Sequence, residues 1–176
     1  MKKVLLIGFL ACISIQATNA QMSESGSLGL GLAWTSLNYG VSAKYNFTET
    51  HTGQVIIGAA NYGFNFSGAS SFSITGRYSY NFDEGDLDFA SWKPYLYGQA
   101  GLWTYKYDIN VFGIRESFSE SAVAIGVGGG IEWSINNFID GLAFTTELGY
   151  TNISFDGLSS IGGFNWGGGI HYYFDL

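Results

Sequence analysis

The chain has 176 residues, of which 18% are aromatic, only 12% are charged and 26 are glycine. A typical globular protein carries about 25% charged residues and about 7% glycine, so this composition favours one domain of many short strands over a helical protein. The formal net charge of −7 argues against nucleic acid as a partner, because nucleic-acid binding relies on Lys and Arg contacts to phosphates.

The first twenty residues are predicted to be a secretory signal peptide. Lys2 and Lys3 precede an apolar run over residues 4–15, and the small residues at 17–20 offer a cleavage site before Gln21. A membrane anchor is disfavoured, because the apolar run is shorter than the ~20 residues that a spanning helix needs. The sequence therefore predicts an exported mature chain of residues 21–176.

Cys12 raises the alternative of a lipoprotein signal. Phe9 stands where such signals usually carry a small aliphatic residue, so this alternative is disfavoured. Removing residues 1–20 removes the only cysteine and leaves 5 basic residues against 14 acidic ones, a net charge of −9. The mature chain therefore has no disulfide and no thiol chemistry.

Large apolar and small polar residues alternate along most of the mature chain, which indicates strands with one apolar and one polar face. The clearest case is 72–82, where Phe72, Ile74, Tyr78 and Tyr80 share one parity and Ser73, Thr75 and Arg77 share the other. The parity of the third and fifth strands is ambiguous. The eight predicted strands are 28–34, 39–47, 54–66, 72–82, 95–107, 123–134, 142–150 and 164–176.

These eight strands predict an all-β fold, an eight-stranded antiparallel up-and-down transmembrane β-barrel over residues 21–176. An even number of strands of ~9–11 residues suits a barrel in lipid, where a sheet must close to satisfy its edges. A soluble barrel of the lipocalin type would place the polar row in water, where surfaces normally carry roughly 25–35% charged residues. The polar row here is mainly Gly, Ser, Thr, Asn and Ala, so the apolar row is expected to face lipid.

With both termini in the periplasm, strand direction and parity predict two belts of aromatic side chains. Periplasmic turns are expected at 48–53, 83–91 and 136–140, and short outer loops at 35–38, 67–71, about 108–117, and 152–160. The outer belt comprises Trp34, Phe66, Phe72, Tyr150 and Phe164, and the periplasmic belt comprises Tyr45, Phe47, Tyr80, Phe82, Trp133 and Phe174.

Three segments carry a resemblance to a known family. Residues 94–101 (Pro-Tyr-Leu-Tyr-Gly-Gln-Ala-Gly), 126–133 (Gly-Val-Gly-Gly-Gly-Ile-Glu-Trp) and 147–150 (Glu-Leu-Gly-Tyr) resemble the small outer-membrane β-barrel family that includes the OmpA transmembrane domain, OmpX and the opacity-type proteins. The resemblance implies an outer-membrane location in a Gram-negative cell envelope. The C-terminal Ile170, Tyr172, Phe174 and Leu176 are similar to the signal read by the barrel assembly machinery, although that signal usually ends in Phe.

Four charged residues with polar-row parity form the candidate functional site. Lys44, Arg77, Glu132 and Glu147 are expected inside the lumen. An eight-stranded barrel is only wide enough for side chains to fill it, and an unpaired buried charge is costly, so opposite charges should pair. An ionic network that plugs the lumen is favoured over a gated ion path. Glycines with the same parity should leave room for large side chains.

Enzymatic function is disfavoured. Lipid A-modifying hydrolysis needs a His base beside a nucleophile near the outer leaflet. His51 falls in the first periplasmic turn and His171 has lumen parity near the periplasmic end. No catalytic, cofactor-binding or metal-ligating residues are predicted. The sequence thus predicts a monomeric outer-membrane barrel, surrounded by membrane lipid, with a structural or surface-interaction role; the alternative is a small passive, porin-like pore. It identifies no host ligand or solute.

Overall fold

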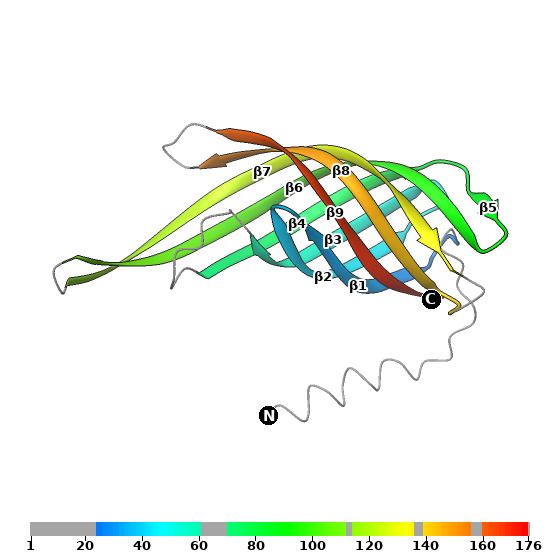
Figure 1. Cartoon of the computed structure of the whole chain (residues 1–176), viewed down its shortest axis with the longest axis horizontal. Coiled ribbons are helices and arrows are strands. Elements are labelled where there is room, and N and C mark those ends of the chain that lie inside the picture. Colours follow the sequence, from blue (N-terminus) through cyan, green and yellow to red (C-terminus); the bar gives the residue numbers. More distant parts are fainter. Residues whose placement is uncertain (1–23, 61–69, 112–113, 136–138, 156–159, 176) are drawn as a thin grey trace, which may run out of the picture.

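The computed structural model describes residues 24–60, 70–111, 114–135, 139–155 and 160–175. Over these residues the chain forms antiparallel strands (Figure 1). No helix in this part is long and apolar enough to cross a membrane. The strands are β1 (Leu28–Thr35), β2 (Asn38–Asn46), β3 (His51–Ala60), β4 (Ser70–Asn81), β5 (Gly85–Leu87), β6 (Ala90–Val111), β7 (Ile114–Ser134), β8 (Leu142–Phe155) and β9 (Ile161–Phe174).

Eight of these strands close into a barrel. Neighbours in sequence pair with one another, β9 pairs back onto β1 from Leu28–Phe174 to Thr35–Gly167, and β4 pairs directly with β6. The short β5 lies outside this ring and forms a small hairpin with the first residues of β6, within the segment expected to be a simple turn. The predicted eight-stranded up-and-down barrel is therefore confirmed, with β5 as an addition.

The side chains alternate between the two faces of the wall as the sequence pattern predicts. In β4, Thr75 and Arg77 are buried while Ile74 and Tyr78 are exposed. The ambiguous parity of β6 is resolved by the burial of Tyr95, Tyr97 and Trp103, which point inward, and by the exposure of Leu96 and Leu102. In β3, Gln54 and Ile56 point inward and Val55 and Ile57 outward.

The β6–β7 hairpin is much longer than the sequence analysis predicts. The pair Ser70–Lys106 is the last between β4 and β6, and Ala122–Phe155 is the last between β7 and β8. Beyond these pairs β6 and β7 continue to pair with each other, up to Val111–Ile114. The prediction of a short loop at about 108–117 was wrong. β6 continues to Val111 and β7 begins at Ile114, and together they form a two-stranded ribbon that projects past the barrel (Figure 1).

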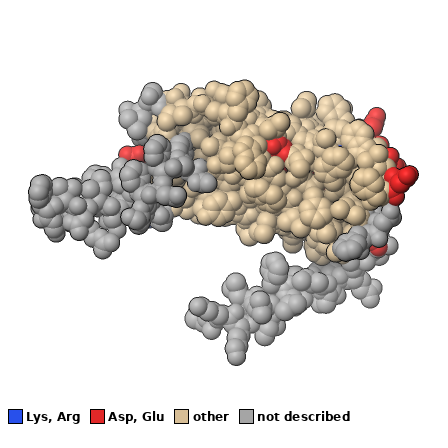
Figure 2. Space-filling model, viewed as in Figure 1, with Lys and Arg blue, Asp and Glu red and all other residues tan. Residues whose placement is uncertain are grey.

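The two ends of the barrel differ. The tip of the β6–β7 hairpin lies at one end, and β5, the β2–β3 turn and the end of β9 lie at the other (Figure 1). Figure 2 shows acidic side chains gathered at the β5 end. The exposed acidic residues of the segment around β5 are Asp83, Glu84, Asp86 and Asp88.

Candidate functional site

Two ion pairs cross the lumen. Arg77 Nη1 of β4 lies 2.7 Å from Glu147 Oε2 of β8, and Lys44 Nζ of β2 lies 3.0 Å from Glu132 Oε1 of β7. The strands in each pair are not neighbours in the sheet, so each bridge spans the interior rather than running along the wall. All four side chains are almost fully buried, and each charge therefore depends on its partner for solvation.

Amide and hydroxyl groups extend the Arg77–Glu147 bridge across the barrel. Arg77 Nε donates to Gln99 Oε1 at 2.8 Å, and Gln99 Nε2 donates to Thr151 Oγ1 at 2.9 Å. Thr151 Oγ1 also accepts from Asn165 Nδ2 at 2.8 Å. Residues of β4, β6, β8 and β9 thus form one connected polar layer.

Three tyrosines complete the ionic network, and the sequence analysis missed all of them. Tyr173 OH donates to Glu132 Oε1 at 2.9 Å. The Lys44 Nζ lies 5.6 Å from the centre of the Tyr95 ring, and the Arg77 Cζ lies 4.6 Å from that of Tyr97. Cations at this distance from an aromatic face gain cation–π attraction. The ambiguous parity of β6 hid Tyr95 and Tyr97, whereas Tyr173 has clear polar-row parity.

Glycines on β7 and β8 make room for these rings. A Cβ at Gly128 would lie 2.5 Å from the Tyr97 hydroxyl, and one at Gly149 would lie 2.6 Å from it. A Cβ at Gly130 would lie 2.7 Å from the Tyr95 hydroxyl. The lumen glycines therefore receive large side chains, as expected; these come from β6, which is one strand away from β7 and two strands away from β8.

An apolar cluster of buried residues lies toward the β6–β7 tip. We call this cluster the apolar seal. Trp103, only 1% exposed, lies further along β6 than Gln99 and is its largest member. Leu37, Tyr105 and Phe155 pack against it. The apolar seal consists of Ala60, Trp103, Ala122, Ala124 and Ile153.

The two histidines lie in different environments. His171 is buried in the lumen, where its Nε2 shares a 2.8 Å hydrogen bond with Ser42 Oγ. Its Nδ1 has no hydrogen-bond partner within the described part of the chain, so no acid orients the ring there. His51 lies on the outward face and shares a 2.8 Å hydrogen bond with Tyr78 OH. Among the described residues, no group of three His, Cys, Asp or Glu side chains could hold a metal ion.

The described aromatic residues of both predicted belts have outward parity. Phe164 and Tyr150 form an edge-to-face pair at 5.4 Å, and similar pairs join Tyr45 with Phe47 and Tyr80 with Phe82. Trp34 and Phe72 are exposed, and Trp133 and Phe174 are partly exposed. Phe66 lies outside the described residues.

The residues of the predicted assembly signal occupy the outward face of β9. Ile170, Tyr172 and Phe174 are partly exposed, and the last two rings pack edge to face at 4.9 Å. They alternate with the buried His171 and Tyr173, and the strand pairs with β1. Leu176 lies outside the described residues.

Comparisons with known proteins agree with this architecture. No protein-family model matches the chain, and no curated protein sequence does. The crystal structure of the N-terminal β-barrel domain of Pseudomonas aeruginosa OprF is similar over 85% of this chain and 98% of that domain, with a TM-score of 0.53 and 15% sequence identity. Ail, the attachment invasion locus protein of Yersinia pestis, matches over 85% of this chain and 99% of Ail, with a TM-score of 0.39 and 18% identity. The chain thus shares the barrel fold of the OprF N-terminal domain.

Proposed function

We propose that the protein is an integral outer-membrane β-barrel with a closed lumen and a structural or surface-interaction role. The single observation that supports it best is the inverted polarity of the wall. Val127 and Leu148 are 65% and 71% exposed on the outward face, whereas Lys44, Arg77, Glu132 and Glu147 are buried inside. In water, the exposed apolar side chains of the first set would be unfavourable. In lipid, the charged side chains of the second set would be unfavourable on the outward face, and they lie inside instead.

The aromatic belts support the same location. Rings of Tyr and Trp prefer the boundary between hydrocarbon and water, and they border the apolar outward face toward both ends. Export through the signal peptide at residues 1–20 and recognition of Ile170, Tyr172 and Phe174 by the barrel assembly machinery belong to this proposal.

The closed lumen is the second part of the proposal. The two ion pairs and their tyrosines lie buried inside the barrel, and the apolar seal lies between them and the β6–β7 tip, which supports a closed lumen. An ion would have to displace a paired charge and then enter an apolar constriction, both of which are unfavourable. This arrangement favours a closed barrel over the small-pore alternative.

Surface interaction is assigned to the β6–β7 ribbon. It extends beyond the strands that flank it, so its two edges have no neighbouring strand among the described residues. Enzymatic function is not proposed, because Ser42 and His171 are enclosed in the lumen, away from any lipid substrate.

Conductance across a planar bilayer tests the closed lumen. The refolded wild-type protein should conduct poorly, and Arg77→Ser should remain closed by the apolar seal. Arg77→Ser combined with Trp103→Ala should conduct, with preference for cations because Glu147 loses its partner. Large, stable open currents in the wild type would overturn the closed lumen and establish the small pore.

A further inference from the structure

The outward face of β2, β3, β4 and β6 carries a groove of about 760 Å³. Its floor is made of small outward residues, among them Ala43, Gly76, Gly98 and Ala100. Tyr45, Phe47 and Tyr78 also line it. The groove is therefore an open, mostly apolar depression in the outer wall that borders aromatic side chains.

Strand register explains the shape of the groove. Ala43 pairs with Val55, Val55 with Gly76, and Gly76 with Ala100, so these four residues form one row of cross-strand neighbours across the floor. Gly98 lies in the next row, where it pairs with Tyr78. Large side chains occupy the adjacent row toward the β6–β7 tip, and their size makes the floor a depression. This row is formed by Val41, Ile57, Ile74 and Leu102.

Two floor glycines are not required by the packing of the protein itself. A Cβ at Gly98 would meet nothing within 4 Å, and one at Gly76 would meet only the Ala100 carbonyl, at 3.9 Å. By contrast, a Cβ at Gly40 or Gly58 would collide with the backbone of the neighbouring strand. Glycine weakens a strand, and a lipid-facing position would accept Val or Leu. The space above Gly76 and Gly98 is therefore open to a molecule outside the described protein.

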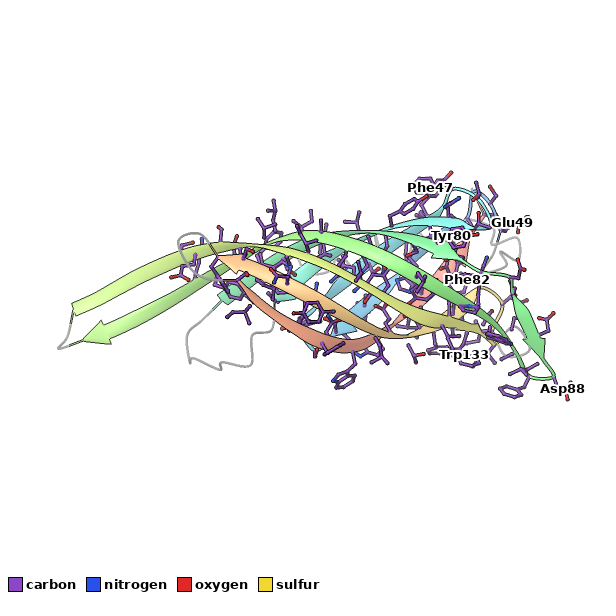
Figure 3. The ribbon with its side chains drawn as sticks, turned by 90° about the horizontal axis from the view of Figure 1, so that it is seen from above. Phe47, Glu49, Tyr80, Phe82, Asp88 and Trp133 are labelled. Atoms are coloured by element: carbon purple, nitrogen blue, oxygen red, sulfur yellow. The ribbon has the colours of Figure 1, made fainter. Side chains whose placement is uncertain are left out.

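Polar groups lie beside the aromatic end of the groove. Tyr78 lines the groove, and its hydroxyl shares a hydrogen bond with His51 Nδ1, while the two rings stack at 5.7 Å. Glu49, in the adjoining β2–β3 turn, is exposed. Figure 3 shows Glu49 close to Phe47, Tyr80 and Phe82 at the β5 end. An apolar groove with a few polar groups at one end suits an amphipathic ligand.

We propose that this groove binds a phospholipid with an ethanolamine headgroup from the periplasmic leaflet. One acyl chain lies along Ala43, Gly76 and Ala100, and the headgroup lies beside His51 and Tyr78. The exposed carboxylate of Glu49 favours a headgroup with an ammonium group and disfavours a purely anionic one. The acidic β5 segment lies at the same end of the barrel and disfavours a second copy of this chain, whose own acidic segment would meet the first. The inference rests on the proposed membrane location.

Native mass spectrometry of the full refolded chain tests the site. The protein is released from detergent micelles that contain equal amounts of phosphatidylethanolamine and phosphatidylglycerol. The wild type should retain phosphatidylethanolamine in preference. Gly76→Phe combined with Gly98→Phe should abolish retention, because the added rings occupy the groove and a Cβ at either position comes no closer than 3.9 Å to a neighbouring atom. Ala100→Leu is a milder groove-filling variant that should reduce retention.

Two control variants make the result specific. Leu148→Phe adds a ring to the outward face of β8, away from the groove, and should retain lipid as the wild type does. Glu49→Gln should retain lipid but lose the preference for phosphatidylethanolamine. The inference is overturned if the wild type retains no lipid, if the filled variants retain as much as the wild type, or if the groove variants instead dissociate a dimer. Failure of the proposed location is distinct, since the wild type would then not insert into vesicles.

Discussion

The inner and outer faces of the same strands obey different rules. Gly126 points inward, and a Cβ there would lie 2.7 Å from Thr151 Oγ1 and 2.8 Å from the Tyr150 carbonyl. Gly98 points outward, and a Cβ there would meet nothing within 4 Å. The inner face is limited by volume and by charge pairing, whereas open outward positions such as Gly98 are limited by polarity. Glycine therefore occurs in this wall for two reasons. At Gly126 there is no room for a side chain, whereas at Gly98 there is room but no side chain.

The largest effect on folding is expected from opening the barrel. Without a closed wall the strands have no separate inner and outer faces. Deleting residues 172–176 removes the β9 partners of Leu28, Gly29 and Leu30 in β1, and it removes the Tyr173 hydrogen bond to Glu132. The open edges cannot be satisfied in lipid. Heat-modifiable migration on gels should disappear. A truncated protein that still inserts and migrates as a folded barrel would contradict closure by β9.

Removing one inner charge should have the next largest effect. Arg77→Ser leaves Glu147 buried without its ion-pair partner, which should lower the free energy of unfolding by about 3–5 kcal/mol. Urea titration in detergent micelles measures the loss. Adding Glu147→Gln should recover part of it, because the unpaired charge is then gone. Equal stability of the single and double variants would show that the bridge matters only through packing.

Adding a charge to the outer face tests its polarity rule. Val127 lies on β7, six residues before the belt residue Trp133. Val127→Arg should destabilise the folded barrel by roughly 2–4 kcal/mol in a bilayer, with the larger value near the midplane. Folding titrations in lipid vesicles measure this, with Val127→Leu as the control. If Val127→Arg destabilises the protein no more than Val127→Leu does, this face does not contact lipid.

The smallest expected effect is the difference in stability between alanine substitutions at Gly126 and at Gly98. Gly126→Ala should destabilise the protein by about 1–3 kcal/mol, because the lumen wall must shift to accept the methyl group. Gly98→Ala should be neutral or stabilising by up to about 1 kcal/mol, because glycine is the poorer strand residue. Matched urea titrations compare the two. Equal costs would remove the distinction between a filled inner face and an open outer face.

Much of the fold could be predicted because period-two alternation is a strong signal. The parity of 72–82 and 123–134 places Arg77 and Glu132 inward without knowledge of any partner. The β6–β7 ribbon could not be predicted in this way. Its residues 108–117 include Asp108, Arg115 and Glu116, and charged residues in a short segment are typical of a loop.

The details of the candidate site depend on the register between strands. The residue pattern within one strand does not determine that register. Which carboxylate faces Arg77 depends on the stagger of β4 and β8 around the barrel. Tyr95 and Tyr97 were missed because both rows of residues 95–105 contain large apolar side chains. The outward groove also depends on register, because pairing of the strands brings Ala43, Gly76 and Ala100, far apart in sequence, into one row.

The burial of Trp103 in the apolar seal separates it from the other four tryptophans of the chain. Trp34, Trp92, Trp133 and Trp166 are outward residues with exposed or partly exposed side chains, whereas Trp103 is 1% exposed within the lumen. Brominated lipids quench the fluorescence of indoles that touch acyl chains. The emission that survives in such vesicles should therefore come largely from Trp103, which makes the protein its own spectroscopic reporter of the seal.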